Sequence, residues 1–183
     1  MVGAELLPLS NPNFEIGPPG QQAIELARVV DRGIRESKTL SFEKLCIEEG
    51  KKAWVVVIDV CTINDAGNLI DTSALAALAA LMDTKFPEYD GEKIDYKTKT
   101  NNRLPLDNSA PVSVTVIKIG NNMLVDLTDE EEIVIDARLT INSKKDGTLC
   151  ALQKGGDAPL TTEEIMRMVD IALEKAKELR SAL

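Results

Sequence analysis

The stretch Gln21–Ser37 has the pattern of an amphipathic helix, and no other feature of the sequence constrains the fold as strongly. Its apolar residues recur three and four positions apart and would share one face of the helix. These residues are Ala23, Leu26, Ala27, Val30 and Ile34. Pro18-Pro19-Gly20 separates the stretch from the residues before it. An apolar face of this kind must be covered by another layer, so we expect the helix to pack on a β-sheet.

The opposite face of this helix carries three arginines: Arg28, Arg32 and Arg35. Residues four and seven positions apart lie on one side of a helix, so a chain of net charge −9 would present one positive stripe. Guanidinium groups form paired hydrogen bonds with phosphates, which favours RNA or another polyanion as partner. The same arginines could instead be ordinary surface charges that pair with Glu25, Asp31 or Glu36, and both interpretations stay open.

The composition indicates one globular domain that is long enough to bury a core. The chain has 183 residues, of which 44% are hydrophobic and 28% charged. Aromatic residues make up only 3%, which argues against proteins that bind single strands by stacking bases on aromatic rings. Contacts with RNA would therefore be made to backbone phosphates. Because the net charge is negative, we expect binding to need a more basic partner.

Several classes of site and location are excluded by what the sequence lacks. It contains no histidine, which removes Ser-His-Asp and Cys-His catalysis and the common zinc ligand sets. Cys46, Cys61 and Cys150 have apolar neighbours, a pattern that predicts buried, reduced thiols. The first residues have no basic leader, and the longest apolar stretch, Ala74–Met82, is too short to cross a bilayer. We expect a cytoplasmic protein with no membrane partner.

The order of the remaining patterns predicts an α+β fold. We expect strands at Glu5–Leu9, Ala53–Ile63, Val112–Ile119, Met123–Val125, Ile133–Ile141 and Thr148–Gln153, and further helices at Ala74–Met82 and Thr162–Leu183. The run Ala53–Ile63 is almost wholly apolar, which predicts a strand covered on both faces. Thr161 and Glu164 have the spacing of a capping box at the start of the last helix. The polar stretch Phe86–Asn108 predicts an exposed excursion that can hold a short hairpin.

A cluster of carboxylates lies between two of the expected strands. Asp126, Asp129 and Glu130–Glu132 could chelate a divalent cation next to Asp136, or could simply form an acidic turn that faces water. Both interpretations stay open.

Most of the chain resembles the non-catalytic RNase PH-like ring subunit of the archaeal exosome. The segments that carry the resemblance are AELLPLSNPNFEIGPP (Ala4–Pro19), AIELARVVDRGIRES (Ala23–Ser37), KLCIEEGKKAWVVVIDV (Lys44–Val60), GNLIDTSALAALAAL (Gly67–Leu81) and DARLTI (Asp136–Ile141). The resemblance implies an RNase PH-like fold in which mixed sheets pack with helices. It also implies that residues 1–183 form a single domain that is incomplete at its N-terminus, because members of the family have a helix and strands before ELLPL.

The resemblance further implies a role in RNA degradation. Subunits of this family alternate with a catalytic sister subunit in a three-plus-three ring, on which RNA-binding cap subunits dock, and the ring degrades RNA from its 3′ end by phosphate attack. The ARVVDR block assigns Arg28 and Arg32 to the RNA backbone phosphates. Arg35 lies outside that block and is the weaker match.

The resemblance also bears on catalysis. The sister subunit holds the attacking phosphate with an arginine in a glycine-rich loop, whereas the equivalent stretch Asp65–Ala74 (DAGNLIDTSA) has no arginine or lysine. We therefore expect the chain to be catalytically inactive alone and to bind no cofactor, with inorganic phosphate and Mg²⁺ held at the sister subunit. Two alternatives stay open. In one, the chain is itself a phosphorolytic 3′-to-5′ exoribonuclease that uses Asp136 as its acid. In the other, it is a scaffold that makes no RNA contact.

Overall fold

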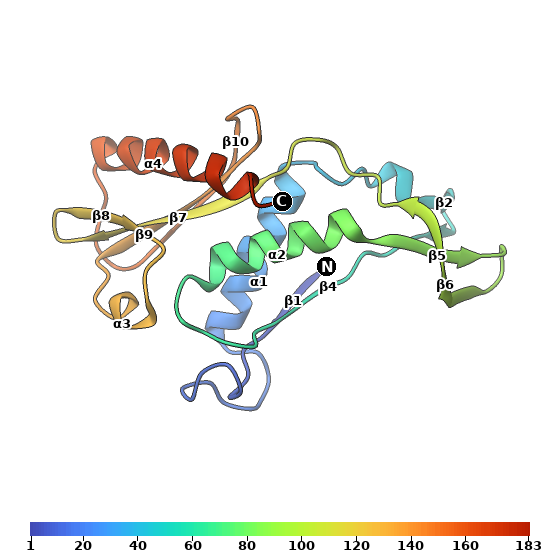
Figure 1. The fold of residues 1–183 in the computed structure, drawn as a ribbon, viewed down its shortest axis with the longest axis horizontal. Coiled ribbons are helices and arrows are strands. Elements are labelled where there is room, and N and C mark those ends of the chain that lie inside the picture. Colours follow the sequence, from blue (N-terminus) through green and yellow to red (C-terminus); the bar gives the residue numbers. More distant parts are fainter.

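A four-stranded antiparallel sheet organises the C-terminal half of the chain and part of the N-terminal half (Figure 1). The computed structural model describes residues 1–183. In spatial order the strands are β10 (Leu149–Gly155), β9 (Ala137–Ser143), β7 (Val112–Ile119) and β8 (Asn122–Val125). Helix α4 (Thr162–Arg180) packs on one face of this sheet, and helices α1 (Gln21–Glu36) and α2 (Leu69–Asp83) pack on the other. The sheet is thus the middle layer of three.

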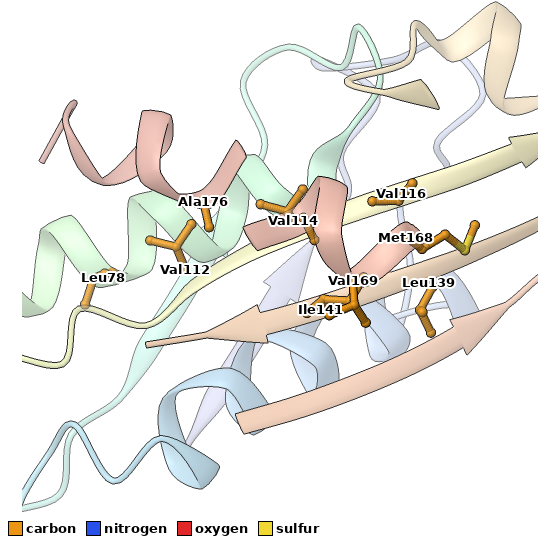
Figure 2. Packing of buried hydrophobic residues seen from close by; sticks show 10 residues of the cluster. Leu78, Val112, Val114, Val116, Leu139, Ile141, Met168, Val169 and Ala176 are labelled. Atoms are coloured by element: carbon orange, nitrogen blue, oxygen red, sulfur yellow. The ribbon is translucent and has the colours of Figure 1, made fainter. Parts of the chain in front are cut away.

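The face of the sheet under α4 is apolar. Strand register pairs Val114 with Ile141 and Val116 with Leu139, so these side chains point to the same side. Figure 2 shows them packed against α4, where Met168 is completely buried. The buried residues of this cluster are Leu78, Val112, Val114, Val116, Leu139, Ile141, Met168, Val169, Ala172 and Ala176. Burial of this hydrocarbon provides most of the driving force for packing α4 on the sheet.

The face under α1 and α2 is polar, although it is also buried. Register pairs Ser113 with Asn142 and Thr115 with Thr140, and all four side chains are buried. The Thr115 and Thr140 hydroxyls lie 2.9 Å apart, and Ser113 Oγ donates to Asn142 Oδ1. No buried side-chain nitrogen or oxygen lacks a hydrogen-bond partner. The layer therefore avoids the free-energy cost of burying unpaired polar groups.

Helix α1 approaches this polar face closely at Gly33. A Cβ atom at this position would lie 2.3 Å from Asn142 Oδ1, inside the contact distance of the two atoms. A glycine in the middle of a helix lowers helix stability, and here it is required by the packing of the helix on β9.

The N-terminal part forms a smaller layer beside the sheet. Strands β1 (Val2–Glu5) and β4 (Ile58–Cys61) pair in parallel, and β2 (Cys46–Glu48) pairs with β3 (Lys52–Ala53). A short 3₁₀ turn, Glu43–Leu45, precedes β2. Four buried leucines form a second cluster: Leu40, Leu45, Leu81 and Leu104.

A hairpin arm projects from this smaller layer (Figure 1). Its strands are β5 (Lys85–Tyr89) and β6 (Ile94–Arg103), and Trp54 packs against the rings of Phe86 and Tyr89 on β5. The hairpin prediction for the polar stretch 86–108 is therefore confirmed. No helix in the structure combines the length and the apolar character that a bilayer span requires.

The strand prediction for Ala53–Ile63 is wrong in extent and in burial. Apart from Ala53, which ends β3, only Ile58–Cys61 of this stretch is in a strand, and β1 is the only partner of that strand. Side chains alternate along it between half-buried and exposed, and Val55 and Val57 are 69% and 55% exposed. The physical reason is that helices cover this pair of strands on one side only, with α2 in contact with β4 and α1 in contact with β1. The expected strand at Glu5–Leu9 is likewise displaced, because β1 ends at Glu5.

Two further boundaries differ from the predictions. Helix α2 begins at Leu69, not at Ala74, and its N-cap is Asn68, which adopts the left-handed conformation (φ 52°) that asparagine tolerates. Strand β9 begins at Ala137, because the preceding residues form the one-turn helix α3 (Asp129–Glu132) and a turn. A capping box between Thr128 and Glu131 stabilises that turn of helix.

The prediction of buried thiols is also wrong. Cys46 and Cys61 are exposed and Cys150 is partly exposed. The neighbours of Cys61 in the sequence are largely apolar, but its side chain lies on the uncovered side of β4. By contrast, the predicted helix Gln21–Ser37 and the Thr161–Glu164 capping box are confirmed.

Candidate functional site

The three arginines of α1 lie in different surroundings. Arg28 is exposed and forms neither a salt bridge nor a side-chain hydrogen bond. Arg32 is half-buried, and its Nη1 donates to Gln153 Oε1 at 2.8 Å. Arg35 pairs with Asp31 at 3.3 Å and with Glu36 at 3.5 Å. The stripe is thus divided: carboxylates of its own helix neutralise Arg35, while Arg28 and Arg32 keep their positive charge.

Arg28 and Arg32 line one groove between α1 and β10. The groove has a volume of about 320 Å³, and its lining residues are Gln21, Ile24, Glu25, Arg28, Val29, Arg32 and Gln153. Because β10 supplies Gln153, the sheet fixes the direction in which the Arg32 guanidinium points. Two guanidinium groups one turn apart, one free and one held by a neutral amide, form a site suited to consecutive anionic groups.

Glu25 lines the same groove, but its partner is not an arginine of α1. Arg138 Nη2 on β9 lies 2.6 Å from Glu25 Oε1, and the two side chains are only 24% and 35% exposed. Strand register places Arg138 opposite Gly155 and Thr140 opposite Gln153, so Arg138 and Gln153 belong to the polar face on which α1 packs. Because Arg138 neutralises Glu25, Arg28 and Arg32 give the groove a net positive charge.

The start of α2 is occupied by groups of this chain. The backbone N–H of Asn68 donates to Glu132 Oε1 at 2.8 Å, and Asn68 Nδ2 donates to Asp126 Oδ1 at 3.1 Å. Asp71 is buried and accepts hydrogen bonds from the backbone and the hydroxyl of Thr115. Burial raises the pKa of Asp71 to about 6, and the two bonds from Thr115 offset this effect only in part. Carboxylates thus surround the helix end at which an anion would otherwise bind.

The acidic residues before β9 serve local structure. Asp136 is exposed and accepts from the backbone N–H of Gly120 at 2.6 Å. The Glu131 carboxylate accepts from the backbone N–H of Thr128 in the capping box of α3, while Asp126 and Glu132 both accept hydrogen bonds from Asn68. No three His, Cys, Asp or Glu side chains converge as metal ligands would. The geometry therefore gives no support to a cation site at this turn.

Two residues have roles at the groove that sequence reasoning did not identify: Gln153, which lines it, and Arg138, which pairs with its Glu25. Polar and apolar residues alternate in DARLTI, which puts Arg138 on the side of its strand away from the apolar core, but nothing in the sequence pairs it with Glu25. Gln153 carried no signal, because its role depends on the distance between β10 and α1 in the folded chain.

Comparisons with known proteins agree with this architecture. Models of the 3′ exoribonuclease family match in two parts, domain 1 over residues 1–87 and domain 2 over residues 109–175. The exosome complex component Rrp42 of Methanosarcina acetivorans is 48% identical over 183 residues, which cover 98% of this chain and 65% of that protein. The Rrp42 component of Thermococcus gammatolerans is 47% identical over 189 residues, which cover 100% of this chain and 67% of that protein.

Solved structures give the same result. A chain of the Archaeoglobus fulgidus exosome with RNA bound to the active site matches with a TM-score of 0.88 and 45% identity, over 99% of this chain and 70% of that one. A chain of an archaeal exosome core matches with a TM-score of 0.83 and 42% identity, over 100% of this chain and 67% of that one. The chain spans about two thirds of the length of the curated relatives that it matches. These matches confirm the α+β, RNase PH-like fold, and the chain belongs to the 3′ exoribonuclease family, within the group of archaeal Rrp42 exosome components.

Proposed function

We propose that this chain is a non-catalytic ring subunit of an archaeal exosome that positions RNA for 3′-to-5′ phosphorolysis by a catalytic sister subunit. One observation carries the proposal: Arg28 and Arg32 share a groove in which neither is neutralised by a carboxylate. The related Archaeoglobus fulgidus exosome binds RNA at its active site, which supports RNA as the polyanion. Arg35 has a smaller role in the proposal, because Asp31 and Glu36 already pair with it.

The proposal assigns the chemistry to the sister subunit. The stretch Asp65–Ala74 offers no cationic side chain, and Glu132 occupies the backbone amide of Asn68. An attacking phosphate would therefore meet negative charge at this helix end. Inorganic phosphate and Mg²⁺ act at the sister subunit in this proposal, within a three-plus-three ring on which RNA-binding cap subunits dock.

The direct test is replacement of the groove arginines in the ring reconstituted with a catalytic sister subunit. Arg28→Ala and Arg32→Ala should each weaken binding of a labelled single-stranded oligoribonucleotide by about tenfold, because each removes charge-assisted hydrogen bonds. Each should also reduce the slope of log affinity against log salt concentration by about 0.7, the value for one lost phosphate contact on a single strand.

Arg167→Ala is the matched control. Arg167 is exposed on α4, on the other side of the sheet, so its replacement removes the same charge without touching the groove. Unchanged RNA affinity and unchanged degradation in both groove variants would remove the proposal and favour a scaffold that makes no RNA contact.

A second experiment tests catalytic inactivity. The purified chain alone is incubated with RNA, phosphate and Mg²⁺, and the proposal predicts no release of nucleoside diphosphates. Release that is abolished by Asp136→Asn would establish the chain as a phosphorolytic exoribonuclease in its own right.

A further inference from the structure

The groove contains a negative charge at a position that opposes its proposed use. Glu25 lies three residues before Arg28, close to one turn of the helix, and its side chain lines the same groove. Side chains at this spacing are neighbours on the helix surface. A free Glu25 carboxylate would repel a bound phosphate and would compete with it for the Arg28 guanidinium.

Arg138 neutralises this charge, and it does so from strand β9 of the sheet on which α1 packs. Its Nη2 lies 2.6 Å from Glu25 Oε1, and both side chains are mostly withdrawn from solvent, so water and salt screen the pair less than they screen a surface pair. Arg28 forms no ion pair at all, which is the expected result if Arg138 satisfies Glu25.

Gly155 provides the space that Arg138 occupies. Register places Gly155 on β10 opposite Arg138 on β9. A Cβ atom at this position would lie 2.5 Å from Arg138 Nε and 3.0 Å from its Cγ and Cζ. The Arg138 side chain thus lies across β10 where any larger residue would displace it, and this course takes it to Glu25.

We propose that Arg138 is a positioning residue for the groove: given room by Gly155, it neutralises Glu25 and so leaves Arg28 free to bind an RNA backbone phosphate. Arg138 contacts no RNA in this proposal and acts only through Glu25. The inference rests on the proposed function, because it assumes that the groove binds RNA.

Arg138→Met tests the proposal, since methionine retains much of the hydrocarbon stem and removes the charge. In the reconstituted ring this variant should bind a labelled single-stranded oligoribonucleotide roughly tenfold more weakly, the effect of one negative charge at the distance of neighbouring helix side chains. Adding Glu25→Gln to the same chain should restore affinity to within about twofold of the original, because the charge that Arg138 compensates is then gone.

A purely structural role for Arg138 gives a different result. If the residue only anchored α1 to the sheet, the double variant would lack that anchor too and would bind as weakly as Arg138→Met alone. Failure of Glu25→Gln to restore binding would therefore overturn the proposal, and so would an Arg138→Met variant that binds RNA normally.

Gly155→Ala offers an independent route to the same answer. It changes no charge, but it should push the Arg138 side chain away from Glu25, lower RNA affinity several-fold and be rescued by Glu25→Gln. Gly17→Ala is the control, because a Cβ atom there would meet nothing within 4 Å. Loss of affinity in Gly155→Ala that Glu25→Gln does not rescue would contradict the proposed role of the glycine.

The arginine variants separate this inference from the proposed function. If Arg28→Ala weakens binding and Arg138→Met does not, the inference fails and the proposed function stands. If neither Arg28→Ala nor Arg32→Ala weakens binding, the proposed function fails and the inference fails with it.

Discussion

Replacement of Asp71 by asparagine should remove a pH-dependent loss of stability from this protein. Asp71 is buried at the interface between α2 and β7, where Thr115 donates two hydrogen bonds to it. Burial raises its pKa from 3.8 to about 6, while the two bonds from Thr115, a bond from Asn68 and the charge of Asp126 have smaller effects. The folded state therefore binds this proton more tightly than the unfolded state does.

The sign and the size of the effect follow from proton linkage. A carboxyl group whose pKa is raised by folding stabilises the protein fully below pH 3.8, and this contribution is lost as the pH rises through about 6. The total change corresponds to about 3 kcal/mol, of which about 2 kcal/mol falls between pH 4 and pH 7. The contribution of Asp71 to the free energy of unfolding should decrease by this amount over that range.

The absence of histidine makes this range unusually easy to interpret. No histidine titrates between pH 5 and pH 7, because the chain contains none. Asp90, Asp95 and Asp146 have pKa values lowered by backbone N–H groups, so their stabilising contributions are complete above about pH 5 and are lost only in more acidic solution. Asp71 thus dominates the slope between pH 5 and pH 7.

The assay is equilibrium unfolding in urea at pH 4, 5, 6 and 7, followed by circular dichroism and by the fluorescence of Trp54, the single tryptophan. Asp71→Asn preserves the shape of the side chain and cannot ionise, so its stability relative to the original protein should rise by about 2 kcal/mol from pH 4 to pH 7. Asp170→Asn, which removes an exposed carboxylate from α4, serves as the control. A stability difference that stays constant or shrinks over this range would refute the reasoning.

Three further substitutions test the packing. Gly33→Ala should destabilise the protein by about 1–3 kcal/mol in urea unfolding, although alanine normally favours a helix, because the added Cβ would lie 2.3 Å from Asn142 Oδ1; an increase in stability would contradict the close approach of α1. Thr161→Ala should cost about 1 kcal/mol in the same assay, because it removes the side-chain cap that accepts from the Glu164 backbone N–H, and an unchanged midpoint would show that the capping box contributes nothing. Met168→Ala should cost about 2–5 kcal/mol, because Met168 is 0% exposed at the centre of the main cluster, whereas Met166→Ala at an exposed position of the same helix should change stability little.

Sequence reasoning succeeded where the determining interactions are local. The helix containing the three arginines was predicted to within one residue of its C-terminal end, because its apolar spacing and the preceding Pro18-Pro19-Gly20 lie within the segment itself. The Thr161–Glu164 capping box and the two strands at Val112–Ile119 and Met123–Val125, which pair as β7 and β8, were predicted for the same reason. The α+β class followed from the order of these elements.

Sequence reasoning failed where contacts between distant segments of the chain determine burial or pairing. Exposure of Val55 and Val57 depends on which layers cover β4, and composition cannot reveal this. At the candidate site, the freedom of Arg28 and the orientation of Arg32 depend on Arg138 and Gln153, more than 100 residues away in the sequence. The sequence was enough to propose these arginines as candidates, but the groups that pair beside them or orient them required the folded chain.

The hydroxyl and amide groups buried beneath α1 and α2 have a consequence for molecular recognition. Two layers that meet through hydrocarbon alone can shift relative to each other at little cost. Hydrogen bonds such as those of Thr115 and Asn142 are directional, so they fix the position of the helices on the sheet. Whatever ligand enters beside Arg32 therefore meets a rigid template. Conformational freedom in that template is lost when the polypeptide folds, so association has to order the exposed Arg28 side chain but little of the backbone beneath it.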